Sequence, residues 1–157
     1  MSEQESPVIL ILGSPADREW SDRIVKSLDR FGVQSEVYTA SAHKTPEWLL
    51  TMLRLWEARP PHVYITVAGR SNALSGFVDA QVMAPVIACP PPSDAFAGLD
   101  ILSSLRMPRG VAPLVVLEPE NAALAAVKIL GLLTPDLQTK VAAAQEAERQ
   151  RVLSHEP

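Results

Sequence analysis

The chain has 157 residues, of which 47% are hydrophobic and 20% are charged, and its formal net charge is −4. This length and composition fit one globular domain, residues 1–157, and exclude a disordered chain. The acidic balance argues against a nucleic-acid partner, which would require a basic face. The single cysteine, Cys89, excludes an intrachain disulfide, and the usual metal-ligand spacings are absent. The N-terminus lacks the pattern of a signal peptide, and no apolar run approaches the ~18 residues of a membrane span, so we expect a cytoplasmic protein that binds no membrane.

Short apolar runs alternate along the chain with segments of helical periodicity. The first run, Val8–Leu12, precedes a helix with Trp20, Ile24 and Leu28 on one face, which Gly32 ends. The second, Val33–Thr39, leads to Thr45 and Pro46, the predicted N-cap and first residue of a helix that Pro60-Pro61 ends. The remaining strands are predicted at His62–Ala68, Pro85–Cys89 and Ala112–Glu118, with helices at 73–83, 119–133 and 135–153 and a short one near 101.

Strands that alternate with helices predict a parallel sheet with helices on both faces. We therefore expect an α/β fold, a three-layer α/β/α sandwich of the flavodoxin-like or Rossmann-like type. Its core spans about residues 8–133, followed by a C-terminal helix at about 135–153. The end of that helix, "AAAQEAERQR", is too polar on most faces to belong to the core.

In such sheets ligands bind beyond the carboxyl ends of the strands, which selects the loops that follow them. In the first loop, "GSPAD", Ser14 and free backbone N–H groups could hold a phosphate and Asp17 could accept hydrogen bonds from ribose hydroxyls. Alternatively, Ser14 and Asp17 only cap a helix. The second loop, "SAHKTP", combines Ser41, His43 and Lys44 at a helix N-terminus, which suits an anion site with a proton-transferring base beside it. The alternative for this loop is a solvated turn.

The third loop, "GRSN", offers Gly69, Arg70, Ser71 and Asn72. Arg70 could bind a phosphate or pair with an acid of a neighbouring subunit, and Ser71 and Asn72 are either polar donors or helix caps. The long loop Pro90–Asp100 has the length of a functional or lid-like segment.

Three other chemically reactive side chains are assigned no role. Cys89 is predicted to be a buried strand-end residue. His62 lies at the opposite edge of the sheet, and His155 lies in the tail.

Six segments, "LGSPAD", "SAHKTP", "VAGRSNALSGFV", "IACPPPSDAFAG", "SSLRMPRG" and "PENAALAA", together resemble the PurE family of purine biosynthesis, in order from about Val8 to Leu133. The third segment resembles the class II pattern, which carboxylates 5-aminoimidazole ribonucleotide (AIR) with CO2. The class I mutases typically have a glycine-rich "GAGGAAHLPG" with a second histidine at this place.

The resemblance implies a reversible carboxy-lyase without biotin, ATP or metal, hence no cofactor. His43 would be the general base that removes the C4 hydrogen after C4 attacks CO2. Ser41, Lys44 and in part Ser14 would contact the phosphate, Asp17 the ribose, and Gly69 and Ser71 the imidazole and CO2. Ala16 departs from the usual Gly-Ser-x-Ser-Asp pattern and removes a hydroxyl, while the backbone N–H stays available, so weaker binding is expected.

The resemblance also implies a symmetric homo-oligomer, a tetramer or octamer, with the C-terminal helix used in the contacts. Two alternative functions stay open. One is the mutase, which takes its carboxyl group from N5-carboxyaminoimidazole ribonucleotide. The other is a non-catalytic, nucleotide-binding, flavodoxin-like module.

Overall fold

The computed structural model describes residues 7–59 and 62–154, and its centre is a five-stranded sheet of order β2-β1-β3-β4-β5. Every neighbouring pair of strands is parallel. The strands are β1 (Val8–Leu12), β2 (Ser35–Thr39), β3 (Val63–Val67), β4 (Val86–Ala88) and β5 (Leu114–Val115). Because the chain moves to one side of β1 and then to the other, the order changes direction between β1 and β3. This doubly wound, flavodoxin-like order has its ligand-binding crevice at that point.

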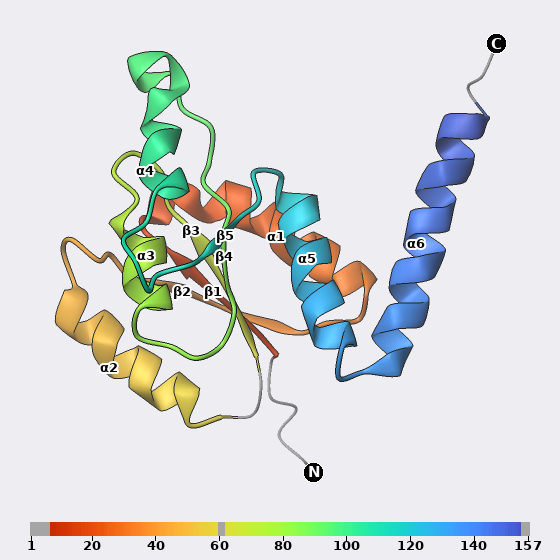
Figure 1. The fold of residues 1–157 in the computed structure, drawn as a ribbon, viewed down its shortest axis with the longest axis horizontal. Helices are drawn as coiled ribbons and strands as arrows, with labels where there is room; N and C mark the ends of the chain where they lie inside the picture. The colour runs from red at the N-terminus through yellow and green to blue at the C-terminus, as the bar shows by residue number, and fades with distance from the viewer. Residues whose placement is uncertain (1–6, 60–61, 155–157) are drawn as a thin grey trace.

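Helices cover both faces of the sheet, as the sequence predicts (Figure 1). They are α1 (Arg18–Arg30), α2 (Pro46–Glu57), α3 (Ala73–Asp79), α4 (Leu102–Leu105), α5 (Pro119–Gly131) and α6 (Pro135–Leu153), with 3-10 helices η1 (Pro15–Asp17) and η2 (Ala95–Ile101). On β1, Val8, Leu10 and Leu12 pack in one core cluster with α1 and α5. Ile9 and Ile11 pack in the other with α2 and α3. The uninterrupted apolar run of β1 therefore comes from a strand that is buried on both faces.

Several predicted elements are shorter in the structure. The predicted strand 112–118 is reduced to Leu114–Val115, and the predicted helix 73–83 ends at Asp79. β5 is an edge strand, and within the described residues it pairs only with the three-residue β4, so few ladder bonds are available to extend it. The predicted stop at Pro60-Pro61 lies outside the described residues. Gly32 does end α1, in the left-handed conformation with φ 71°.

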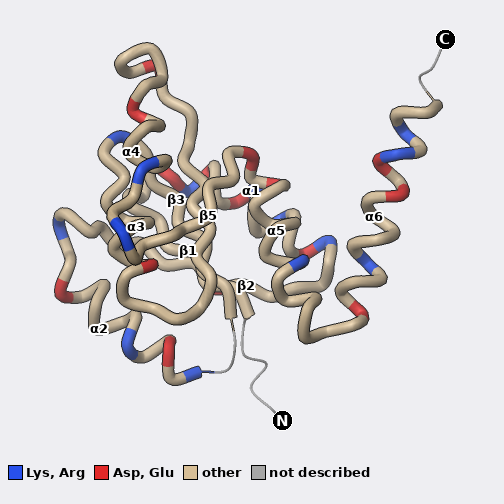
Figure 2. The backbone as a smooth tube through the Cα atoms, viewed as in Figure 1, with Lys and Arg blue, Asp and Glu red and all other residues tan. Residues whose placement is uncertain are grey.

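The last helix, α6, extends away from the sheet (Figure 1). Its buried residues are Leu137 and Val141, both in its first half. Lys140 Nζ donates a hydrogen bond to the Phe31 carbonyl oxygen at 2.7 Å, which attaches this half to the end of α1. Charges of both signs follow one another along the helix (Figure 2). Over residues 7–59 and 62–154, no helix combines the length and apolar character needed to cross a membrane.

Candidate active site

The loops after β1, β2, β3 and β4 surround one cavity of about 530 Å³ at the carboxyl edge of the sheet. All but one of the predicted site residues line it. They are Ser14, Asp17, Ser41, His43, Lys44, Gly69, Arg70 and Ser71. Sequence reasoning left out the wall that Pro91, Pro92 and Ser93 form, although the length of the loop Pro90–Asp100 had indicated a function.

The first loop is packed directly against the end of β3. The Gly13 N–H donates to the Val67 carbonyl oxygen at 2.9 Å, and a Cβ at Gly13 would lie 3.0 Å from that of Ala68. Ser14 caps η1, because its hydroxyl accepts the Ala16 N–H at 3.2 Å. That N–H, expected to stay available for a phosphate, is thus already donated within the loop.

Asp17 occupies the N-cap position of α1 without a side-chain capping bond, so its carboxylate remains available to a ligand. Burial raises the pKa of the Asp17 carboxyl. A hydrogen bond from the backbone at Ser14 and the positive charge of Arg70 oppose this rise. Arg70 and Asp17 therefore interact electrostatically within the cavity that both line.

The second loop forms a closed turn before α2. Thr45 is at the predicted N-cap position, but its side chain makes no capping bond to α2. Its hydroxyl instead donates to the Ser41 carbonyl oxygen at 3.2 Å and accepts the Ser41 N–H at 3.0 Å. The Ser41 hydroxyl accepts the Lys44 N–H at 3.2 Å. These bonds leave His43 and Lys44 exposed on the rim of the cavity.

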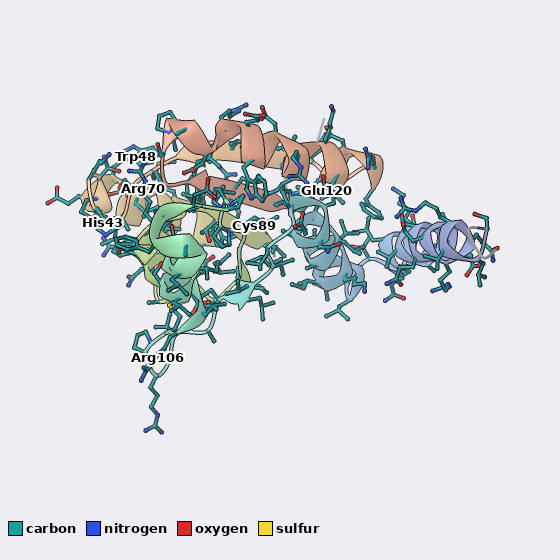
Figure 3. All side chains as sticks on the ribbon, turned by 90° about the horizontal axis from the view of Figure 1, so that it is seen from above. His43, Trp48, Arg70, Cys89, Arg106 and Glu120 are labelled. Atoms are coloured by element: carbon teal, nitrogen blue, oxygen red, sulfur yellow. The ribbon has the colours of Figure 1, made fainter. Side chains whose placement is uncertain are left out.

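The third loop contributes Gly69, Arg70 and Ser71 to the opposite wall. Arg70 has φ 59°, in the left-handed region that non-glycine residues rarely adopt. Figure 3 shows Arg70 and His43 on the same side of the molecule, and both line the cavity. The two loops thus bring a guanidinium and an imidazole to a shared space.

Asn72 is the predicted site residue that does not line the cavity, because its side chain is held in a buried network. It is 4% exposed and caps α3, with its Oδ1 accepting the Ser75 N–H at 3.2 Å. Its Nδ2 lies 2.8 Å from the Ser75 hydroxyl and 2.9 Å from the Ser104 hydroxyl. The capping alternative is therefore what the structure shows for Asn72.

Cys89 is fully buried at the end of β4, as predicted. Burial raises the pKa of its thiol to about 11, which disfavours the nucleophilic thiolate. The cavity is accordingly lined by hydroxyl, carboxylate, imidazole and cationic groups, a combination that is typical of enzyme sites in α/β folds.

Comparison with known proteins identifies the family to which this enzyme belongs. Residues 7–151 match the family model described as AIRC, AIR carboxylase. The phosphoribosylaminoimidazole carboxylase of Treponema denticola is 48% identical over 147 residues, which cover 93% of this chain and 92% of that protein. The protein of the same name from Archaeoglobus fulgidus is 51% identical over 144 residues, covering 92% and 79% of the two chains. The crystal structure of Treponema denticola PurE superposes with a TM-score of 0.92 at 48% identity, and covers 94% of each chain.

The chain therefore belongs to the AIR carboxylase, or PurE, family of purine biosynthesis. As a member it is an enzyme of the carboxy-lyase type.

Proposed function

We propose that this chain is a class II enzyme, which joins CO2 to C4 of AIR to give 4-carboxy-5-aminoimidazole ribonucleotide (CAIR). The observation that carries the proposal is the composition of the cavity. Among the residues that line it, His43 is the single histidine, and the loop after β3 supplies Gly69, Arg70 and Ser71. A second histidine in that loop is the feature by which the class I pattern differs.

The order of the strands supports one orientation of the nucleotide in this proposal. The loop after β2, with Ser41 and Lys44, would bind the phosphate. The loop after β1, with Asp17, lies between the other two and would bind the ribose hydroxyls. The loop after β3 would then receive the imidazole, because β1 lies between β2 and β3 in the sheet.

The reaction needs one proton transfer at carbon. The amino group of AIR makes C4 an enamine carbon, so the C4 electron pair attacks the carbon of CO2, and one C–O π pair becomes the carboxylate charge. C4 is then tetrahedral and still carries its hydrogen. His43 accepts this proton, the C–H electron pair restores the aromatic ring, and the imidazolium passes the proton to water. In the reverse direction the same imidazolium protonates C4 before CO2 leaves.

A homo-oligomer, a tetramer or an octamer, is part of the proposal. Its support is the surface around α6, where Leu132 is 77% exposed and Val152 is 68% exposed. Light scattering of the purified chain would measure its mass in solution, and a monomer would contradict this part.

The proposal is tested by comparing two substrates. Turnover of AIR with CO2 and bicarbonate, in the absence of ATP, is measured beside turnover of N5-carboxyaminoimidazole ribonucleotide in CO2-depleted buffer. Activity with AIR and CO2 alone supports the class II reaction. Activity with the N-carboxylated nucleotide alone would make the chain a mutase. Nucleotide binding without turnover of either would indicate a non-catalytic module.

A further inference from the structure

The Ser103 hydroxyl, outside the predicted site, joins two loops that border the cavity. It donates to the Arg70 carbonyl oxygen at 2.8 Å and accepts the Asn72 N–H at 3.0 Å, so it holds both sides of the turn at Ser71. The Asp100 carbonyl oxygen also lies 2.8 Å away, so the single hydroxyl proton has two acceptors. Ser103 therefore connects the turn after β3 with the end of the long loop after β4.

The turn needs such support because of its backbone conformation. The left-handed conformation of Arg70, with φ 59°, is unfavourable for a residue with a Cβ. Strained residues of this kind persist where the surrounding structure fixes them. Two hydrogen bonds of Ser103 hold the backbone of Arg70 and that of Asn72, two positions later.

Behind Ser103 the turn is anchored in the interior. Asn72 Nδ2 contacts the hydroxyls of Ser75 and Ser104, and the Ser75 hydroxyl lies 2.7 Å from that of Thr66 on β3. Thr66, Ser75 and Ser104 are all buried. This anchor fixes Asn72, whereas the Arg70 side of the turn depends on the partly exposed Ser103.

We propose that Ser103 is a positioning residue that holds Arg70 and Ser71 against the carboxylate which the reaction adds to the imidazole. The inference rests on the proposed function, in which the loop after β3 receives the base. Arg70 and Ser71 line the cavity in that loop, and a guanidinium pairs well with a carboxylate. AIR has no carboxylate at C4, so the turn distinguishes CAIR from AIR.

The test measures the dissociation constants of both nucleotides by titration calorimetry, with His43→Asn present in every protein so that CAIR is not decarboxylated during the titration. Ser103→Ala is expected to weaken CAIR binding about tenfold, the loss of roughly one hydrogen bond to a charged group, and to change AIR binding less than about twofold. Ser103→Thr keeps the hydroxyl and should restore the ratio of the two constants that is found with Ser103 in place. Thr51→Ala is the matched control, because it removes an exposed hydroxyl that donates to the Glu47 carbonyl oxygen at 2.9 Å on α2.

A second variant makes the test independent of the folding of Ser103→Ala. Arg70→Asn keeps a residue that tolerates the left-handed conformation and removes the guanidinium, so it should show the same selective loss of CAIR affinity. An unchanged ratio of the two dissociation constants in either variant, including equal weakening of both nucleotides by Ser103→Ala, would overturn the inference. Wild-type protein that binds neither nucleotide would overturn the proposed function, and the inference with it.

Discussion

The two histidines in the described part of the chain lie at opposite edges of the same sheet and have opposite surroundings. His43 follows β2 at the carboxyl edge and is exposed on the rim of the cavity. His62 precedes β3 at the amino edge, is 6% exposed, and meets the Tyr64 ring edge-on with 4.7 Å between the centroids. Its Nε2 lies 3.3 Å from Glu57 Oε1.

Polar groups at the amino edge interact with one another. The Glu57 carboxylate accepts the Tyr64 hydroxyl at 3.2 Å and the Met83 N–H at 2.9 Å. Burial, followed by the charge of Glu57, raises the pKa of Tyr64 far above its usual range. At the carboxyl edge, the side chains of Asp17, His43 and Lys44 instead face an open cavity. The edge of the sheet on which each of these histidines lies thus decides whether its side chain faces the cavity or packs within the fold.

The sharpest test of this difference exchanges each histidine for asparagine. His43→Asn should retain nucleotide binding and lower turnover about 10²–10⁴-fold, because it removes the base that we propose takes the C4 proton. His62→Asn should keep turnover per folded molecule and lower the free energy of unfolding by about 1–3 kcal/mol, since it removes a buried polar partner. Steady-state kinetics and urea unfolding of both variants provide the two measurements. Full activity of His43→Asn would remove this residue from the mechanism.

A smaller effect is expected from the cation beside His43. Lys44→Ala should raise the Michaelis constant for the nucleotide about tenfold and lower turnover less, because the proposed contact of Lys44 with the phosphate would be lost in substrate and transition state alike. Lys128→Ala, which removes an exposed lysine of α5, is the matched control. An unchanged Michaelis constant in Lys44→Ala would contradict the phosphate role.

The smallest effect concerns stability at the two edges. Because burial raises the pKa of Asp17, the folded chain binds the proton of this carboxyl group more tightly than the unfolded chain does. The contribution of Asp17 to the free energy of unfolding is therefore fully present below the pKa that Asp17 has in the unfolded chain. It is lost as the pH rises through the higher pKa of the folded chain. Asp17→Asn should therefore raise the free energy of unfolding near neutral pH, by no more than about 0.5 kcal/mol, while weakening nucleotide binding.

This gain should disappear below about pH 3, where the wild-type carboxyl is protonated in both states. Thermal melts at the two pH values measure it. Glu57→Gln, at the amino edge, should instead lower the free energy of unfolding, because the Glu57 carboxylate accepts hydrogen bonds from the Tyr64 hydroxyl and the Met83 N–H. A destabilised Asp17→Asn at neutral pH would show that the carboxylate supports the fold.

The local sequence pattern was sufficient to predict the central sheet and most of the residues that line the cavity. The run Val8–Leu12 predicts a strand buried on both faces, and the rule for ligands at the carboxyl ends of strands selects the loops that surround the cavity. The choice between a ligand role and a capping role for Asn72 could not be made in this way. Asn72 directly follows Ser71, which lines the cavity, but its side chain turns inward to partners that include Ser104. The link from Ser103 to Arg70 spans 33 positions, and no spacing in the sequence indicates it. The direction in which α6 leaves the sheet could not be predicted either, because the apolar residues of this helix form no single stripe.

Gly13 and Ala68 line the cavity side by side, and they lie so close that a Cβ on Gly13 would be only 3.0 Å from the Ala68 Cβ. Two of the smallest residues meet at its floor, and the hydrogen bond from Gly13 to Val67 keeps β1 and β3 from separating there. The distance from the first loop to the third is therefore set by backbone packing before any ligand arrives. A spacing that is fixed in this way would reduce the free energy that a ligand must spend on ordering the protein when it binds.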